Sequence, residues 1–268
     1  MNDGNRSFSG SIPALYDRHL ASLFFEPYAN DLAARLDGLT SGDLLELAAG
    51  TGVLSRALAR ALPPAVSLVC TDLSQSMLSY AAARSDSRIL WRHADAQQLP
   101  FPDNLFDSAV CQFGVMFFPD KAAAYREVRR VLKPGARFLF SVWDRLEENE
   151  LSLVVDAAMA EFFPHDPPQF VARDPFGYFD TIRIEHDLRA AGFSSIDRQT
   201  VVQRGRAPSS LDVAIGLCQG TPLRNAIEAR GPHLLSQVTD AVSTAVASRF
   251  GSGAIDTRMQ AHVFTVSR

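Results

Sequence analysis

The sequence predicts an α/β fold with a seven-stranded, mostly parallel sheet and helices on both faces. From residue 43 to residue 143, short apolar segments of strand length alternate with helical segments. Strands that alternate with helices are joined by crossover connections, and such connections produce parallel pairing. A turn rich in small residues, 48–52, lies between the first strand and the helix that follows it. In open parallel sheets, ligands bind at this end of the strands, so the turn is also the first candidate site.

Each element has a local signal. Ser74 is a typical N-cap, the prolines at 63 and 64 end a helix, and glycines at 192 and 251 follow two others. The expected helices are 12–25, 27–39, 52–62, 74–83, 121–132, 185–191 and 232–250, and the expected strands are 43–47, 67–71, 88–92, 108–113, 137–142, 195–203 and 258–266.

The alternation of strands and helices is interrupted after Trp143. Residues 144–182 contain four prolines among aromatic residues, and residues 208–230 contain a loop around Gly220. Neither insertion is long enough to fold alone, so we expect the two to pack together as a cap. The expected organisation is one domain plus this cap: N-terminal helices and the ligand-binding core in 1–143, the first cap insertion in 144–182, core in 183–207, the second cap insertion in 208–230, and the core C-terminal helix and strand in 231–268. Residues 1–11 are expected to form a mobile tail.

Composition excludes several classes of function. The chain has 268 residues and a net charge of −4, which does not suit binding to nucleic acid or to an anionic membrane through released counterions. The basic cluster around Arg130, from residue 126 to 133, is interpreted as the solvated face of a helix. No segment has the length of a membrane span or of a signal peptide. The three cysteines lack zinc-ligand spacing. We therefore expect a cytoplasmic protein with no metal site and no insertion into a membrane.

The turn after the first strand carries the chemistry. Small residues at Ala48, Gly50 and Gly52 let the backbone approach a ligand closely, and the N-terminus of the next helix adds free N–H groups. Such a turn fits NAD, FAD or S-adenosylmethionine. Asp72 follows Gly52 by 20 residues, at the end of the second strand, where a carboxylate can accept hydrogen bonds from two ribose hydroxyls. The alternative interpretation of Asp72 is a helix cap or a solvated loop carboxylate.

Five ordered motifs make the family resemblance specific. They are residues 46–52, 71–78, 94–101 and 106–110, and residues 127–128 together with 132–135. The run resembles class I S-adenosylmethionine-dependent methyltransferases, in particular the type-11 group that includes ubiquinone/menaquinone-biosynthesis C-methyltransferases. The resemblance implies the Rossmann-like class I methyltransferase fold, with S-adenosylmethionine as the cofactor and S-adenosylhomocysteine as its product. Ala48 departs from the family pattern, which has glycine there.

Cofactor contacts follow from the resemblance and from the strand ends. Asp95 can accept from the adenine amine, and Ala96 leaves room for the ring. Glu46 is expected to order the turn or to meet the amino-acid end of the cofactor, and Gln112 is an unusual polar residue in an apolar strand. The expected cofactor-binding residues are Glu46, Ala48, Gly50, Gly52, Asp72, Leu73, Met77, Asp95, Ala96, Gln112 and Phe113.

No catalytic constellation is expected. Methyl transfer from a sulfonium is accelerated mainly by positioning, and it needs a base only when the acceptor must lose a proton as it attacks. Tyr16 and His19 in the N-terminal segment, and His165 and Tyr178 in the first insertion, are the catalytic candidates. For each of them the more ordinary interpretation is packing or surface. The phenylalanines of the first insertion line either an apolar substrate cavity or a small hydrophobic core.

The leading hypothesis is methyl transfer to the O, N or C atom of a small, partly apolar molecule. The alternatives are C-methylation of a quinone precursor and a methyltransferase-fold protein that binds the cofactor without transferring methyl. An NAD-dependent enzyme is disfavoured by Asp95 and by residues 132–135. The expected partner is a small molecule, not nucleic acid. The sequence leaves open the acceptor atom, the choice between monomer and homodimer, and whether the cap closes only on ligand binding.

Overall fold

A single seven-stranded sheet organises the chain. The computed structural model describes residues 10–268, so residues 1–9, most of the expected mobile tail, lie outside the described residues. The strand order is β3-β2-β1-β4-β5-β7-β6. The bounds are β1 Gly42–Leu47, β2 Val66–Asp72, β3 Ile89–His93, β4 Phe106–Gln112, β5 Leu132–Trp143, β6 Ser195–Ala207 and β7 Ile255–Ser267.

The sheet is mostly parallel, as predicted. β1 pairs in parallel with β2 and β4, β2 with β3, and β4 with β5. Only β7 runs antiparallel to its neighbours, β5 and β6. Chain order reverses at β1, because the chain goes outward to β3 and then returns to β4 on the other side. The carboxyl ends of β1 and β4 therefore flank a topological switch point, where open α/β sheets bind ligands.

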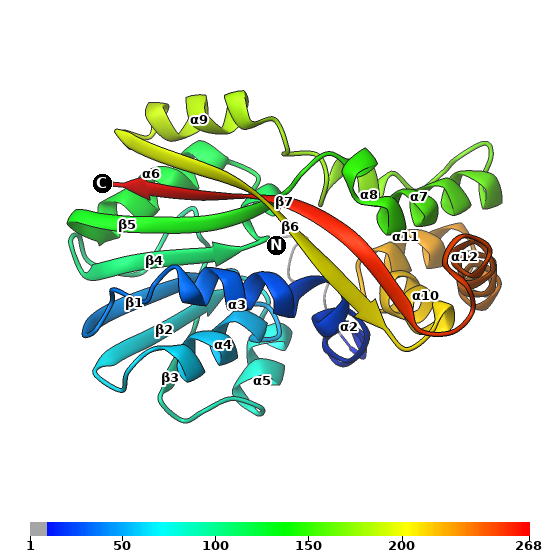
Figure 1. Ribbon diagram of the computed structural model, residues 1–268, viewed down its shortest axis with the longest axis horizontal. Helices are drawn as coiled ribbons and strands as arrows, with labels where there is room; N and C mark the ends of the chain where they lie inside the picture. Colours follow the sequence, from blue (N-terminus) through cyan, green and yellow to red (C-terminus); the bar gives the residue numbers. More distant parts are fainter. Residues whose placement is uncertain (1–9) are drawn as a thin grey trace.

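Two hydrophobic cores cover the two faces of the sheet. Leu44, Leu68 and Val110 face one core, and their neighbours Leu45, Val69 and Ala109 face the other, because successive side chains of a strand point to opposite faces. The first core lies under α3 Glu26–Ala34 and α4 Val53–Ala61, and the second under α6 Lys121–Val131 and α9 Thr181–Ala190. The short helix α5 Gln75–Ala82 packs beside β3 at the sheet edge (Figure 1). The predicted fold class is confirmed.

The cap is built from helices that lie beyond one end of the strands (Figure 1). The first insertion supplies α7 Glu150–Phe162 and α8 Phe170–Arg173, and the second supplies α10 Ser210–Gln219 and α11 Leu223–Arg230. α8 contacts α11, so the two insertions do meet. The N-terminal helix α2 Ile12–Leu20 packs on α10. Three short helical segments complete the chain: η1 Ala21–Phe25, η2 Val115–Phe117 and η3 Leu146–Glu148.

The expected helix 232–250 is present, and its buried valines belong to the same hydrophobic core as the sheet. It is α12 Leu234–Phe250, and it packs against α7 and α10. β6 and β7 extend as a long antiparallel pair and carry it away from the sheet centre (Figure 1). Two helix bounds differ from expectation. α9 begins four residues earlier than predicted, where the Asp180 carboxylate accepts from the backbone N–H groups of Ile182 and Arg183. α3 ends at Ala34 rather than at residue 39.

Candidate functional site

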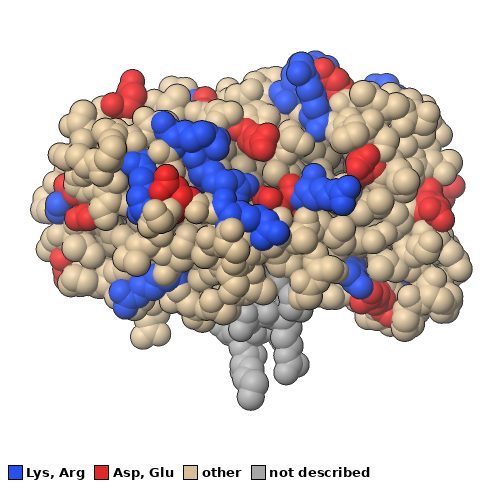
Figure 2. Space-filling model, turned by 90° about the horizontal axis from the view of Figure 1, so that it is seen from below, with Lys and Arg blue, Asp and Glu red and all other residues tan. Residues whose placement is uncertain are grey.

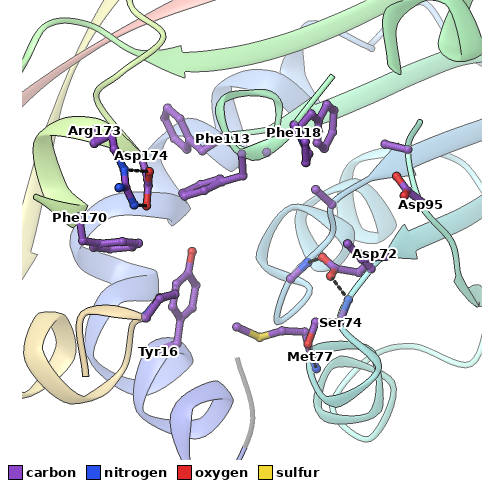
Figure 3. Close-up of a pocket in the computed structure, with 18 of the residues that line it drawn as sticks. Tyr16, Asp72, Ser74, Met77, Asp95, Phe113, Phe118, Phe170, Arg173 and Asp174 are labelled. Carbon is purple, nitrogen blue, oxygen red and sulfur yellow. Dashed lines mark hydrogen bonds and ion pairs between the residues drawn. The ribbon is translucent and has the colours of Figure 1, made fainter. Parts of the chain in front are cut away.

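A cavity of about 640 Å³ lies at the carboxyl ends of β1, β2 and β4, beneath the cap. Its volume is in the range of small-molecule sites. One wall comes from the strand ends, with Asp72 and Asp95, and the opposite wall comes from the cap, with Phe170, Arg173 and Asp174 (Figure 3). Arg173 and Asp174 pair with each other at 2.9 Å.

The turn between β1 and α4 holds unusual backbone angles. Ala48, Gly50 and Gly52 all have positive φ, at 52°, 56° and 82°. This conformation costs an alanine about 1–2 kcal/mol but costs glycine nothing. The Ala48 side chain fits because the residue beside it is Gly114, where an added Cβ would lie 2.5 Å from the Cβ of Ala48. At Gly50 an added Cβ would meet nothing within 4 Å. The turn at Gly50 therefore faces open space. Ala48 and Gly50 both line the cavity.

Asp72 ties the end of β2 to this turn. One carboxylate oxygen accepts from the Gly50 backbone N–H at 2.8 Å, and the other accepts from the Ser74 backbone N–H at 2.7 Å. Each oxygen keeps a second lone pair for a ligand hydroxyl. Burial is the main cause that raises the pKa of this carboxyl. Asp72 lines the cavity (Figure 3). Its position therefore suits both ordering the turn and binding a ribose.

Glu46 lies beneath the turn and is 2% exposed. Its carboxylate accepts from the Ser55 hydroxyl at 2.6 Å and from the Cys70 thiol at 3.1 Å. Burial raises the pKa of Glu46 to about 7, and the two hydrogen bonds oppose that rise. Glu46 lines only a small side chamber of about 40 Å³, between the turn and Tyr16. These contacts favour the first of its two expected roles, which is to order the turn.

The wall expected to bind adenine is assembled from two strand ends. Asp95 accepts from the backbone N–H of Gln97 at 2.9 Å and from its amide at 3.1 Å, which holds the carboxylate in place at the cavity edge. Leu73, Met77 and Ala96 also line the cavity. The structure thus brings these four predicted residues together.

Gln112 and Phe113 lie at the end of β4. The Gln112 amide donates to the backbone carbonyl of Phe25 at 2.7 Å, which explains a polar residue here: it fastens the N-terminal helices over the sheet. Phe113 has a φ of 50°, and its ring stacks on Trp143 with centroids 3.9 Å apart. Gln112 and Phe113 both line the cavity. Ten of the eleven predicted cofactor residues line the main cavity or its side chamber. Gly52 does not, because it is the N-cap of α4 and packs near Trp91.

Thr51 is a site residue that the sequence analysis missed. Its hydroxyl is buried, has no hydrogen-bond partner among the described residues, and lies beside the side chamber. A buried unpaired hydroxyl costs about 1–3 kcal/mol unless a ligand completes it. This orphan group fits a cofactor that carries polar atoms at its amino-acid end. The available signal was a hydroxyl residue placed between the two glycines of the turn.

Tyr16 is the one catalytic candidate that reaches the cavity. It lines the main cavity, the side chamber and a further apolar sub-cavity, and its ring faces the cavity across from Met77 (Figure 3). The ring stacks on Phe25 at 5.1 Å. Burial, followed by the carboxylates of Asp72 and Asp17, raises the pKa of its hydroxyl. The phenol therefore stays protonated at neutral pH, so it can donate a hydrogen bond but is unsuited to act as a base.

The other three catalytic candidates are not brought to the cavity. His19 is buried and pairs with Asp212 of α10 at 3.1 Å, which fastens α2 to the cap. His165 is exposed and lines none of the cavities. The Tyr178 hydroxyl donates to Asp187 at 2.7 Å, between the first insertion and α9. These residues are occupied by packing or solvent. Within residues 10–268, no group of three or more His, Cys, Asp and Glu side chains could hold a metal ion.

The cap contributes the apolar sub-cavity, of about 100 Å³, which shares Tyr16, Phe113, Phe117, Phe170 and Pro222 with the main cavity. Of the phenylalanines in the first insertion, Phe170 and Phe176 line it. Phe162 and Phe163 instead pack on each other at 4.9 Å, and Phe179 is 37% exposed. Some of these aromatic residues therefore line an apolar cavity and others pack on each other or face solvent, in different parts of the insertion.

Comparisons with known proteins agree with this geometry. The "Methyltransferase domain" family model matches residues 45–140. The ubiquinone/menaquinone biosynthesis C-methyltransferase UbiE of Pseudomonas putida is 37% identical over 135 residues, which cover 48% of this chain and 53% of the relative. The UbiE of Saccharophagus degradans is 33% identical over 175 residues, which cover 59% of this chain and 70% of the relative. The chain thus spans about half the length of the first of these relatives.

A solved structure extends the likeness of fold into the cap. Phosphoethanolamine N-methyltransferase 2 of Haemonchus contortus, in complex with phosphomonomethylethanolamine and S-adenosylhomocysteine, superposes with a TM-score of 0.60 at 18% identity. The match covers 96% of this chain and 56% of that one. Together with the matched family model and relatives, the fold and the turn place this chain in the class I S-adenosylmethionine-dependent methyltransferase family, within its type-11 group.

Proposed function

We propose that this chain transfers the methyl group of S-adenosylmethionine to a small, partly apolar molecule. The observation that carries the proposal is a single cavity with two unlike walls. One wall presents Asp72, Asp95 and the turn at Gly50, and the other presents the aromatic rings of the cap together with the Arg173–Asp174 ion pair. A polar nucleoside cofactor fits the first wall, and an apolar acceptor fits the second.

The residues act in this reaction by positioning. The bound cofactor supplies a methyl group on a sulfonium, which is already a good leaving group. Asp72 and Asp95 orient the nucleoside, the Thr51 hydroxyl completes its hydrogen bonding at the amino-acid end, and Tyr16 separates that end from the acceptor. Holding two reactants in line contributes about 7–11 kcal/mol to lowering a barrier in favourable cases.

A second candidate function is C-methylation of a quinone precursor. The two UbiE relatives favour it, because their names state this activity. The match to the family model ends at residue 140, whereas the cap begins after Trp143. Most residues that line the apolar sub-cavity lie outside the region that matches the family model. We therefore rank an apolar acceptor other than a quinone precursor first.

Calorimetry and label transfer test the proposal. We expect S-adenosylmethionine and S-adenosylhomocysteine to bind, and NAD not to bind. Incubation of metabolite extracts with methyl-labelled cofactor should label a small apolar product. NAD binding without any response to the sulfur cofactors would overturn the assignment. Binding without label transfer across broad extracts would instead favour a cofactor-binding protein that has no transferase activity.

We further propose that the partner is a small molecule in the cytoplasm. On the face shown in Figure 2, Asp and Glu side chains lie beside the band of Lys and Arg side chains. In the predicted basic cluster, Arg130 pairs with Glu127 and Asp103, and Lys133 pairs with Asp107. These pairings compensate much of the positive charge that a nucleic acid would need. Separately, no helix within residues 10–268 is long and apolar enough to cross a membrane.

A further inference from the structure

The apolar sub-cavity beside Tyr16 has an unusual lining. Eight of its lining side chains are aromatic, including Phe24, Trp143 and Phe176, and most of the others are aliphatic. Three lining residues have hydroxyls: Tyr16, Ser152 and Thr221. Among the described residues that line it, none is Asp, Glu, His, Lys, Arg or Cys. A ligand group that enters this space therefore meets neither a counter-charge nor a carboxylate or imidazole base.

The lining decides which charge the acceptor can carry. An anionic acceptor would lose its water and gain no positive side chain, which is costly in an apolar space. A protonated amine would lose its water and find no carboxylate. An uncharged group avoids both penalties. The faces of aromatic rings are negative, so they stabilise a positive charge that develops only during the reaction.

Ser152 is the free polar group of this space. The Thr221 hydroxyl donates to the Leu217 carbonyl and accepts from the Leu223 N–H, so its bonding is complete. Ser152, on α7, is 5% exposed, and no described residue makes a hydrogen bond to its hydroxyl. One free hydroxyl in an apolar site is the arrangement that orients a ligand carrying one polar atom.

We propose that the sub-cavity is the acceptor site for an uncharged amine on an apolar group, that Ser152 orients this group, and that its nitrogen is methylated without an enzyme base. This inference rests on the proposed methyl transfer. The nitrogen lone pair forms a bond to the methyl carbon while the sulfur–methyl bond breaks, and the electron pair of that bond stays on sulfur. The products are S-adenosylhomocysteine and an N-methylated ammonium, which gives any remaining N–H proton to water after release.

Binding of simple probes tests the acceptor class. The protein is saturated with S-adenosylhomocysteine and titrated with N-methylaniline, anisole, benzoate and benzylammonium, with Trp143 fluorescence as the readout in a Trp91→Phe background. Trp143 lines the sub-cavity and Trp91 does not. We expect N-methylaniline and anisole to bind at least tenfold more tightly than the two ions. Tighter binding of benzoate or benzylammonium would overturn the proposal.

Two variants and a control locate the binding. Leu217→Phe fills the sub-cavity from a half-buried position, so it should weaken N-methylaniline at least tenfold and change S-adenosylhomocysteine affinity less than twofold. Ser152→Ala should raise KM for N-methylaniline about three- to tenfold, because the Ser152 hydroxyl accepts from the amine N–H and leaves the nitrogen lone pair free. Binding of anisole, which has no N–H to donate, should not change. Ser248→Ala, on the exposed surface of α12, is the matched control. Unchanged probe binding in Leu217→Phe would place the acceptor elsewhere.

The pH dependence tests the absence of a base. Methylation is measured for ring-substituted N-methylanilines of different basicity. The acid limb of kcat/KM should move with the pKa of each amine, because only the neutral form reacts. A limb that stays at one pH for all amines would reveal an enzyme base and overturn the proposal. If the unmodified protein does not bind S-adenosylhomocysteine, the proposed function itself is refuted. Failure of the acceptor proposal and failure of the proposed function are therefore distinguishable.

Discussion

The cavity has two walls that are built by different means. We call the wall at the strand ends, with Asp72, Asp95 and the turn at Gly50, the cofactor wall, and the aromatic lining of the apolar sub-cavity the acceptor wall. The cofactor wall depends on backbone: Asp72 binds two backbone N–H groups, and the turn at residues 48–52 holds positive φ angles. The acceptor wall depends on side chains, namely rings from α2, η1, the segment after β4, the end of β5 and the cap. The cofactor wall is therefore set by local geometry, whereas the acceptor wall is set by packing between distant segments.

Removing Asp72 should have the largest effect on the cofactor wall. Asp72→Ala leaves the N–H groups of Gly50 and Ser74 without their partner and removes the expected ribose acceptor. Hydrogen bonds to charged groups are worth about 1.5–3 kcal/mol, so S-adenosylhomocysteine affinity, measured by calorimetry, should fall at least tenfold. Asp37→Ala is the control, because Asp37 is exposed and does not line the cavity. An unchanged affinity would show that Asp72 does not bind the cofactor.

The next largest effect should come from a substitution that crowds the turn and lowers the free energy of unfolding. In Gly114→Ala the new methyl would lie 2.5 Å from the Cβ of Ala48 and 2.7 Å from the sulfur of Cys111. Overpacking of this kind costs about 1–3 kcal/mol, which should appear as a lower free energy of unfolding in urea. Adding Ala48→Gly should recover part of the loss, because it removes one of the two clashes. If the second substitution recovers nothing, Ala48 and Gly114 are not coupled.

The buried Glu46 should make the stability of the free protein depend on pH. Its folded pKa of about 7 lies above the ordinary value of 4.5. The folded state therefore holds this proton more tightly than the unfolded state, so its contribution is favourable at low pH and is lost as pH rises through about 7. The loss between pH 5 and pH 8 should be about 2–3 kcal/mol. The difference between the unmodified protein and Glu46→Gln, measured by urea unfolding across this range, isolates it; equal pH slopes would contradict the pKa.

Thr51 should show the smallest effect, with opposite signs on stability and binding. Thr51→Val keeps the shape of the side chain and removes a buried hydroxyl that has no partner among the described residues. The free protein should be equally or more stable, and cofactor affinity should fall about three- to tenfold. Thr51→Ser retains the hydroxyl and serves as the control. Loss of both stability and affinity in Thr51→Val would indicate a packing role instead.

Much of the cofactor wall could be predicted because its signals are local. A strand, a tight turn and a helix follow one another in sequence, and the acids at the ends of β2 and β3 meet at one edge because parallel strands end together. Thr51 was missed for a physical reason: whether a hydroxyl finds a partner depends on atoms from other segments. Ala48 was an expected weakness of the site, and the structure shows how Gly114, distant in sequence, accommodates it.

The catalytic candidates and the cap could not be placed from the sequence. His19 has a chemically suitable side chain, but its neighbour Asp212 is 193 residues away and turns it into a packing contact. The aromatic wall combines Phe24 and Trp143 with Phe176, and no periodic pattern links residues so far apart.

The parallel sheet, the turn at residues 48–52 and the acids at the strand ends could be predicted from sequence, because periodicity and turn chemistry act over a few neighbouring residues. Packing between distant segments fixes which side chains line the apolar sub-cavity. It placed Tyr16 between the two walls, packed α12 against α7 and α10, and left Ser152 in an apolar space with no hydrogen bond to another described residue. These outcomes depend on packing between segments far apart in the chain, and such contacts leave no local pattern in the sequence.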